Sequence, residues 1–109
     1  MKYNNKNTTC TTYCRKGLWR WRILQDDDII GAGDLSFKFQ DDALMDMEFL
    51  LDNRWIFPDL MYYEDAVGDW RWRITADKDT LYSSHQGWKD KEQCMYNAKY
   101  LATSEWDCN

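Results

Sequence analysis

The chain has little of the residues that loosen or interrupt a fold. Only one Pro and five Gly occur in 109 residues, which argues against a flexible or low-complexity chain. Its apolar runs are short, so no segment is expected to cross a membrane. Residues 1–15 contain no apolar stretch of the kind that a secretory signal needs. The expected compartment is therefore the cytoplasm, of a cell or of an infected host.

Residues suited to catalysis are also scarce. The one His, His85, follows Ser83 and Ser84, but a nucleophilic Ser–His site also needs an orienting acid and an oxyanion hole. No nucleophile-elbow motif, phosphate-binding loop or dinucleotide fingerprint is present. The aspartates at 26–28 and 41–42 lack the ligand spacing of a calcium loop. We therefore predict no catalytic residues, no metal site and no cofactor, and we expect a protein that is not an enzyme.

The cysteines need a separate decision. They are Cys10, Cys14, Cys94 and Cys108, and the Cys-x3-Cys pair at the start has no second close pair. Because no secretory signal is seen, reduced cysteines with a structural role are favoured. A disulfide and a metal site are the two alternatives that the spacing leaves open.

Aromatic residues are abundant and charge is mildly negative. Seven Trp and seven Tyr supply a large apolar area per residue, so a chain of this length can bury one core as a single domain over residues 1–109. The net charge of −5, from 19 acids and 14 bases, favours solubility. It also disfavours non-specific binding to nucleic acid through the protein as a whole.

One motif occurs twice. Residues 19–23, Trp-Arg-Trp-Arg-Ile, recur without change as residues 70–74, at a spacing of 51. The same spacing joins Gly17 to Gly68 and Trp55 to Trp106 without a gap. A register kept over this length indicates an internal repeat. The two repeats are placed at residues 8–57 and 59–108.

Each repeat predicts three strands, a helix and a short last strand. Alternation of apolar and polar residues predicts strands, and a period of three to four predicts helices. The first repeat predicts strands at 8–13, 18–24, 29–34 and 54–57, with a helix at 40–51. The second predicts strands at 60–63, 70–76 and 80–84, a helix from residue 90 and a strand at Trp106. Gly31 and Gly33 either weaken their strand or mark a bulge.

The two predicted helices have apolar stripes. Asp90 is interpreted as an N-cap, with Gln93 completing a capping-box variant. The stripes consist of Ala43, Leu44, Met47, Leu50 and Leu51 in the first helix, and of Cys94, Met95, Ala98, Leu101 and Ala102 in the second.

The repeated strand has two unlike faces. Trp and Ile alternate with Arg, so the Trp face is expected to be buried and the Arg face to be open. Arg makes bidentate contacts with carboxylates and phosphates, and acidic turns would flank the face. The favoured interpretation is that Asp or Glu on neighbouring strands neutralise these arginines. The candidate binding residues are Arg20, Arg22, Arg71, Arg73, Asp26, Asp27, Asp28, Asp77 and Asp79.

The repeated Trp-Arg-Trp-Arg-Ile, followed by an Asp-containing turn, a strand, an aromatic residue and a helix, resembles the YegP-like domain of unknown function. The resemblance implies an α+β fold with two β(3)-α-β units in tandem. It implies one antiparallel sheet with the helices on one face, pseudo-two-fold symmetry and C-terminal strands exchanged between the units. The family has no known activity, so it supplies no catalytic residues.

Together these features predict a small, acidic, non-enzymatic module that binds a macromolecule. The specific form expected is an inhibitor or regulator of a nucleic-acid-handling protein complex, with a protein partner that presents a basic surface. The alternative is direct binding of nucleic acid or another anionic ligand through the outward Arg face. The module is expected to be a monomer, because the second repeat supplies the partner that a single unit would need.

Overall fold

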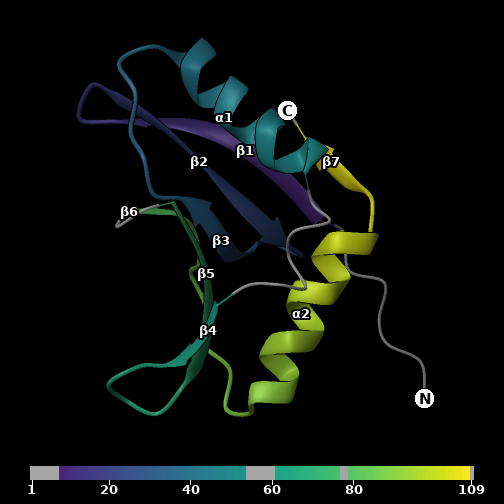
Figure 1. Ribbon diagram of the computed structural model, residues 1–109. Helices are drawn as coiled ribbons and strands as arrows, with labels where there is room; N and C mark the ends of the chain where they lie inside the picture. Colours follow the sequence, from purple (N-terminus) through teal and green to yellow (C-terminus); the bar gives the residue numbers. More distant parts are fainter. Residues whose placement is uncertain (1–7, 54–60, 77–78, 109) are drawn as a thin grey trace.

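The computed structural model describes residues 8–53, 61–76 and 79–108, which form an α+β domain (Figure 1). The first part of the chain contains β1 (Thr8–Arg15), β2 (Leu18–Gln25), β3 (Asp28–Gly33) and α1 (Gln40–Asp52). The second contains β4 (Met61–Glu64), β5 (Trp70–Ala76), β6 (Asp79–Ser84), α2 (Lys91–Thr103) and β7 (Trp106–Cys108). The predicted strand at 54–57 lies outside the described residues. Neither α1 nor α2 has the length and apolar character needed to cross a membrane.

All the described strands belong to one mixed sheet, in the order β4-β5-β6-β3-β2-β1-β7. The sheet contains two antiparallel meanders, one of β1, β2 and β3 and the other of β4, β5 and β6. They join where β3 pairs antiparallel with β6. The last strand, β7, runs parallel to β1, so the prediction of a wholly antiparallel sheet is wrong at this edge. A hairpin forces neighbouring strands to be antiparallel, whereas a strand that returns after a helix is free to run in either direction.

Irregularities of the sheet occur at matching places in the two meanders. The register between β2 and β3 shifts between Ile23 and Leu24. The register between β5 and β6 shifts between Ile74 and Thr75. After each meander the chain returns to the start of the Trp-Arg strand, where Trp19 pairs with Phe37 and Trp70 with Trp88. A bulge increases the local twist of a strand pair, so both meanders bend at the same point.

The helices cover the Trp face of the sheet. Helix α1 packs on β1 and β2, and α2 packs on β4 and β5. Trp21 and Trp72 are completely buried beneath them. The apolar stripes supply the buried helix residues Ala43, Met47, Leu50, Cys94, Ala98 and Leu101.

Two details of the predicted second helix are wrong. Met95 is 43% exposed, because α2 turns Asn97 toward the core and Met95 away from it. Asp90 is the N-cap residue, but its side chain makes no capping hydrogen bond. The backbone carbonyl of Asp90 accepts the first helical hydrogen bond, from the Cys94 N–H, as an N-cap residue does.

Gly31 and Gly33 make room for the two buried indoles. A methyl group built on Gly33 would collide with the indole nitrogen of Trp21. One built on Gly31 would lie 3.0 Å from the Trp72 ring, which comes from the other meander. Because β3 is the strand at which the meanders join, these glycines allow both rings to approach its backbone.

Cys10 and Cys108 form a disulfide, so the expectation of four reduced cysteines is wrong for this pair. The parallel pairing of β1 with β7 places the two residues opposite each other, with their Cα atoms 4.5 Å apart. That spacing suits a disulfide. The pairing could not be predicted from a local pattern, because the two cysteines are 98 residues apart in the sequence. Cys14 is a free, exposed thiol, whereas Cys94 is free and buried. Burial raises the pKa of the Cys94 thiol to about 12.

Truncation of either buried Trp is expected to destabilise the fold strongly. Trp21→Ala and Trp72→Ala should each lower the free energy of unfolding by about 3–5 kcal/mol, because each leaves a large cavity beneath a helix. Arg22→Ala removes an outward side chain and should cost about 1 kcal/mol or less. Urea unfolding followed by circular dichroism measures all three. An Arg22 variant less stable than both Trp variants would mean that the faces of β2 are reversed.

The number of thiols that react with a reagent should match one disulfide and two free cysteines. Unfolded but unreduced protein should contain two thiols that react with a chromogenic disulfide reagent, and reduction should raise the number to four. In the folded protein an alkylating agent should modify Cys14 rapidly and Cys94 slowly, because burial keeps Cys94 protonated and inaccessible. Peptide mass mapping identifies the modified residue. Four reactive thiols before reduction would contradict the disulfide.

Candidate binding face of the sheet

The sheet face opposite the helices carries a row of side chains that joins the two meanders. Across the strands, Arg22 pairs with Ala32, Ala32 with Ser83, and Ser83 with Arg73. At a spacing of about 4.8 Å per strand, the two arginine Cα atoms lie about 14 Å apart. The small side chains of Ala32 and Ser83 lie between them, and the Asp34 carboxylate accepts a hydrogen bond from Ser83. We call this surface the Arg face.

Each end of the row carries the same stack of arginine on tyrosine. The Arg22 guanidinium carbon lies 4.8 Å from the ring centroid of Tyr13, and the Arg73 carbon lies 4.8 Å from that of Tyr63. In both cases the Tyr lies on the neighbouring strand, β1 or β4, opposite the other arginine of the motif, Arg20 or Arg71. Stacking holds a guanidinium flat and leaves its N–H edge available for other contacts.

Neither stacked arginine is paired with a carboxylate among the described residues. Arg73 Nε donates to the Met61 thioether sulfur at 3.2 Å, and Arg22 Nε is buried without a hydrogen-bond partner. A thioether is a weak acceptor, so Arg73 retains the capacity to bind a stronger one. Arg22, whose Nε is buried, could reach a ligand only through its Nη groups. The prediction that acidic neighbours neutralise the Arg face therefore does not hold for these two arginines.

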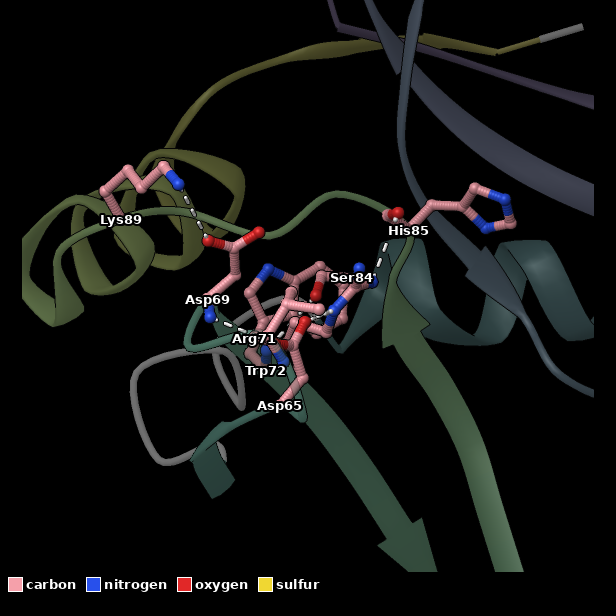
Figure 2. Close-up of polar contacts among 8 residues, drawn as sticks. Asp65, Asp69, Arg71, Trp72, Ser84, His85 and Lys89 are labelled. Carbon is pink, nitrogen blue, oxygen red and sulfur yellow. Dashed lines mark hydrogen bonds and ion pairs between the residues drawn. The ribbon is translucent and has the colours of Figure 1, made fainter.

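The other two motif arginines do have acidic neighbours. Arg71 Nε donates to Asp65 Oδ2 at 2.7 Å, and its Nη1 donates to the His85 carbonyl oxygen (Figure 2). The Asp65 carboxylate also accepts from the backbone N–H groups of Val67 and Asp69. The bond from Arg71, followed by those backbone bonds, lowers the pKa of Asp65 below its ordinary value of 3.8. Arg71 thus closes a turn and is held in place by it.

Asp34 is the acidic residue whose charge interacts with Arg20. Its carboxylate accepts from the Ser83 hydroxyl at 3.1 Å. Burial raises the pKa of Asp34 above 3.8, and this effect outweighs the Ser83 bond and the positive charge of Arg20. Asp65 thus pairs with Arg71, whereas Asp34 lies beside Ser83 in the middle of the row and interacts with the Arg20 charge. Among the described residues, no carboxylate pairs with Arg22 or Arg73.

The acidic residues predicted from sequence lie elsewhere. Asp26 and Asp27 form the tip of the β2–β3 hairpin, with positive φ values of 50° and 74°. Asp28 is the first residue of β3 and Asp79 is the first residue of β6. Both therefore lie at strand ends and not beside the arginines of the row. Asp77 lies outside the described residues. The positive φ angles assign the hairpin tip a turn role, because Asp tolerates the left-handed region better than most residues do.

The sequence reasoning missed Asp34, Asp65, Tyr13 and Tyr63 as members of this surface. A local signal existed for Asp65, because an Asp three residues before a Gly is typical of a side chain that accepts from its own turn. The two Tyr residues occur at different distances from the repeated motif, so the repeat spacing of 51 did not single them out.

Ser83, Ser84 and His85 do not form a catalytic arrangement. The Ser84 hydroxyl accepts from the Trp72 N–H on the buried side of the sheet. The exposed His85 ring points away from Arg71 and Asp65 in Figure 2. In the described residues, no group of three His, Cys, Asp or Glu side chains could hold a metal ion.

Buried polar bonds support the Arg face from the helix side. Trp21 Nε1 donates to Asp46 Oδ2 at 2.8 Å, and the Tyr82 hydroxyl donates to Asp46 Oδ1 at 2.9 Å. Burial, followed by the Asp46 charge, raises the pKa of the Tyr82 phenol. The β2 and β6 strands are thus joined to α1 directly beneath the Arg face, which keeps its backbone rigid.

Comparison with known proteins identifies the fold. No family model and no curated protein matches the sequence. The solved structure of the protein of unknown function yegP from E. coli has a TM-score of 0.66 and 11% identity, covering 100% of this chain and 97% of that one. UPF0339 protein SO3888 from Shewanella oneidensis has a TM-score of 0.69 and 9% identity, covering 94% of this chain and 91% of that one. The chain has the YegP-like fold.

The Asp65–Arg71 turn predicts a specific pH dependence. A lowered folded-state pKa means that ionised Asp65 stabilises the fold above pH 3.8 and that this stabilisation is lost as pH falls through the folded value. Asp65→Asn should therefore be less stable than wild type near pH 6, and the difference should shrink below pH 4. The control Glu105→Gln changes an exposed residue outside the helices. Equal effects of the two variants at pH 6 would rule out a special role for the turn.

Proposed function

We propose that this protein is a binding module that performs no chemistry of its own and holds an anionic segment of a macromolecule against the Arg face. The observation that carries the proposal is the pair of matching stacks, Arg22 on Tyr13 and Arg73 on Tyr63. Each presents a guanidinium that no described carboxylate neutralises. Guanidinium N–H groups match the geometry of carboxylate and phosphate oxygens.

The partner that suits this face best is an acidic segment of a protein. The strand residues between the stacks, Ala32 and Ser83, have small side chains, and a spacing of about 14 Å corresponds to about four extended residues. A partner with carboxylates at this spacing would contact both arginines. By covering an acidic segment of a partner protein, such as one that mimics nucleic acid, the module would inhibit or regulate the complex to which that protein belongs.

The proposal includes a pseudo-two-fold arrangement of two tandem repeats. The matching register shifts, the matching Trp pairings and the two stacks support it. The pairing of β7 with β1 supports an exchange of C-terminal strands between the repeats. In this arrangement each repeat completes the core of the other, which favours a monomer, and the two stacks form one continuous surface.

A second candidate function is direct binding of single-stranded nucleic acid by the same face. The favouring observation is that each positive charge lies on an aromatic ring, which is the combination that binds phosphates and stacks on bases. The net charge of −5 opposes this function, because it repels a polyanion at long range. An acidic peptide, with far fewer charges, is repelled less.

Two probes separate these candidates: a fluorescent polyglutamate peptide and a fluorescent oligothymidylate. Binding measured by anisotropy should be seen for the peptide and should weaken by at least about tenfold in the Arg22→Ala, Arg73→Ala double variant. Lys99→Ala removes an exposed charge on α2, which covers the other side of the sheet, and is the control. Tighter binding of the oligonucleotide would favour the second candidate. Equal effects of the double variant and the control would place binding outside the Arg face.

A further inference from the structure

The outer face of α1 carries a surface of opposite character to the Arg face. Met45 is 65% exposed and Phe49 is 57% exposed. They are four residues apart, so their side chains are neighbours on the helix surface. The exposed acids around them are Asp41, Asp42, Glu48 and Asp52. We call these six residues the α1 patch.

All the charged side chains of α1 are acidic. The helix contains five acidic residues and no basic one. Asp46 accepts hydrogen bonds from Trp21 and Tyr82 within the fold. Asp41 and Asp42 lie in the first turn, where negative charge interacts favourably with the helix dipole. Helix stability thus explains part of the acidic composition.

Glu48 and Asp52 have no such explanation. They form a like-charge pair at i and i+4, which destabilises a helix. Asp52 is also the last residue of α1, where the dipole disfavours negative charge, and the last turn of the helix contains no basic residue. Met45 and Phe49, whose large apolar side chains are exposed among these carboxylates, do not contribute to the core. The arrangement works against the stability of the isolated domain, as expected of a binding surface.

The corresponding surface of α2 is a natural comparison. Position 96, which is 51 residues after Met45, holds Tyr96, and that residue is 40% exposed. The α2 helix carries Lys91, Glu92 and Lys99, so its charges are mixed. Lys91 is also engaged with the Trp70 ring. The two helices have similar places on the sheet, but only α1 combines exposed apolar residues with an uncompensated negative field.

We propose that the α1 patch is a docking surface for a basic amphipathic helix of a partner protein. Apolar residues of that helix would cover Met45 and Phe49, and its Lys or Arg residues would meet the four surrounding carboxylates. Membrane surfaces and nucleic acids are both negatively charged, so the same field repels them. This proposal stands apart from the function of the Arg face, which is on the other side of the sheet and attracts the opposite charge.

The test uses a synthetic helical peptide with Leu on one face and Lys on the other. A control peptide has the same composition in an order that spreads Leu around the helix. Both are titrated with the whole protein at physiological salt, followed by fluorescence anisotropy. The amphipathic peptide should bind at least about tenfold more tightly than the scrambled one, because only it presents apolar and basic residues together.

Variants locate the site. The Met45→Ser, Phe49→Ser pair and the isosteric Glu48→Gln, Asp52→Asn pair should each weaken binding of the amphipathic peptide by about tenfold or more. Tyr96→Ser on α2 is the matched control and should change it less than about twofold. All variants change exposed side chains, and thermal melting checks that they remain folded.

Three outcomes would overturn the proposal: no binding of the amphipathic peptide, equally tight binding of the scrambled peptide, or an equal effect of Tyr96→Ser. The Arg22→Ala, Arg73→Ala variant should bind the amphipathic peptide as wild type does. Failure of the Arg face and failure of the α1 patch are therefore distinguishable.

Discussion

The bonds from the two buried indoles to the helices are the constraint on which the rest of the structure depends. Trp21 donates to Asp46 of α1, and Trp72 donates to Asn97 of α2, at positions 51 residues apart. An indole N–H buried without an acceptor would cost roughly 1–3 kcal/mol. Each helix is therefore fixed in rotation and height over its own Trp-Arg strand. That placement in turn determines which side chains reach the core and which remain outside.

The same two helix residues also connect the halves of the sheet. Asp46 accepts a second bond from Tyr82 of the other meander, and Asn97 donates to Gln25. Gln25 in turn donates to Thr8, the residue beside Trp106 in the parallel pair. A continuous polar path therefore runs from α2 to the edge that the Cys10–Cys108 disulfide closes. Because the buried side is so constrained, the alternate side chains of the same strands, the arginines, are held in fixed positions on the other face.

Much of the fold was predictable because its signals are local. Alternating Trp and Arg define a strand with one buried face, and the apolar spacing at residues 43–51 defines a helix. The structure confirms the α+β class, the two helices and the YegP-like fold. The direction of β7 and the disulfide were not predictable in the same way. Both depend on residues 98 positions apart meeting at one sheet edge, which no local pattern encodes.

For the candidate surfaces, the sequence by itself determined which residue types face outward: the four arginines on β2 and β5, and the acids of α1 other than Asp46. Strand and helix periods are sufficient for this, because they arise from backbone geometry. Only the tertiary structure decided which of these charges remain uncompensated. Asp65 binds Arg71 and Asp34 lies near Arg20, whereas Arg22 and Arg73 rest on Tyr13 and Tyr63. The physical reason is that neutralisation depends on distances of a few ångströms between side chains on different strands, and strand pairing sets those distances.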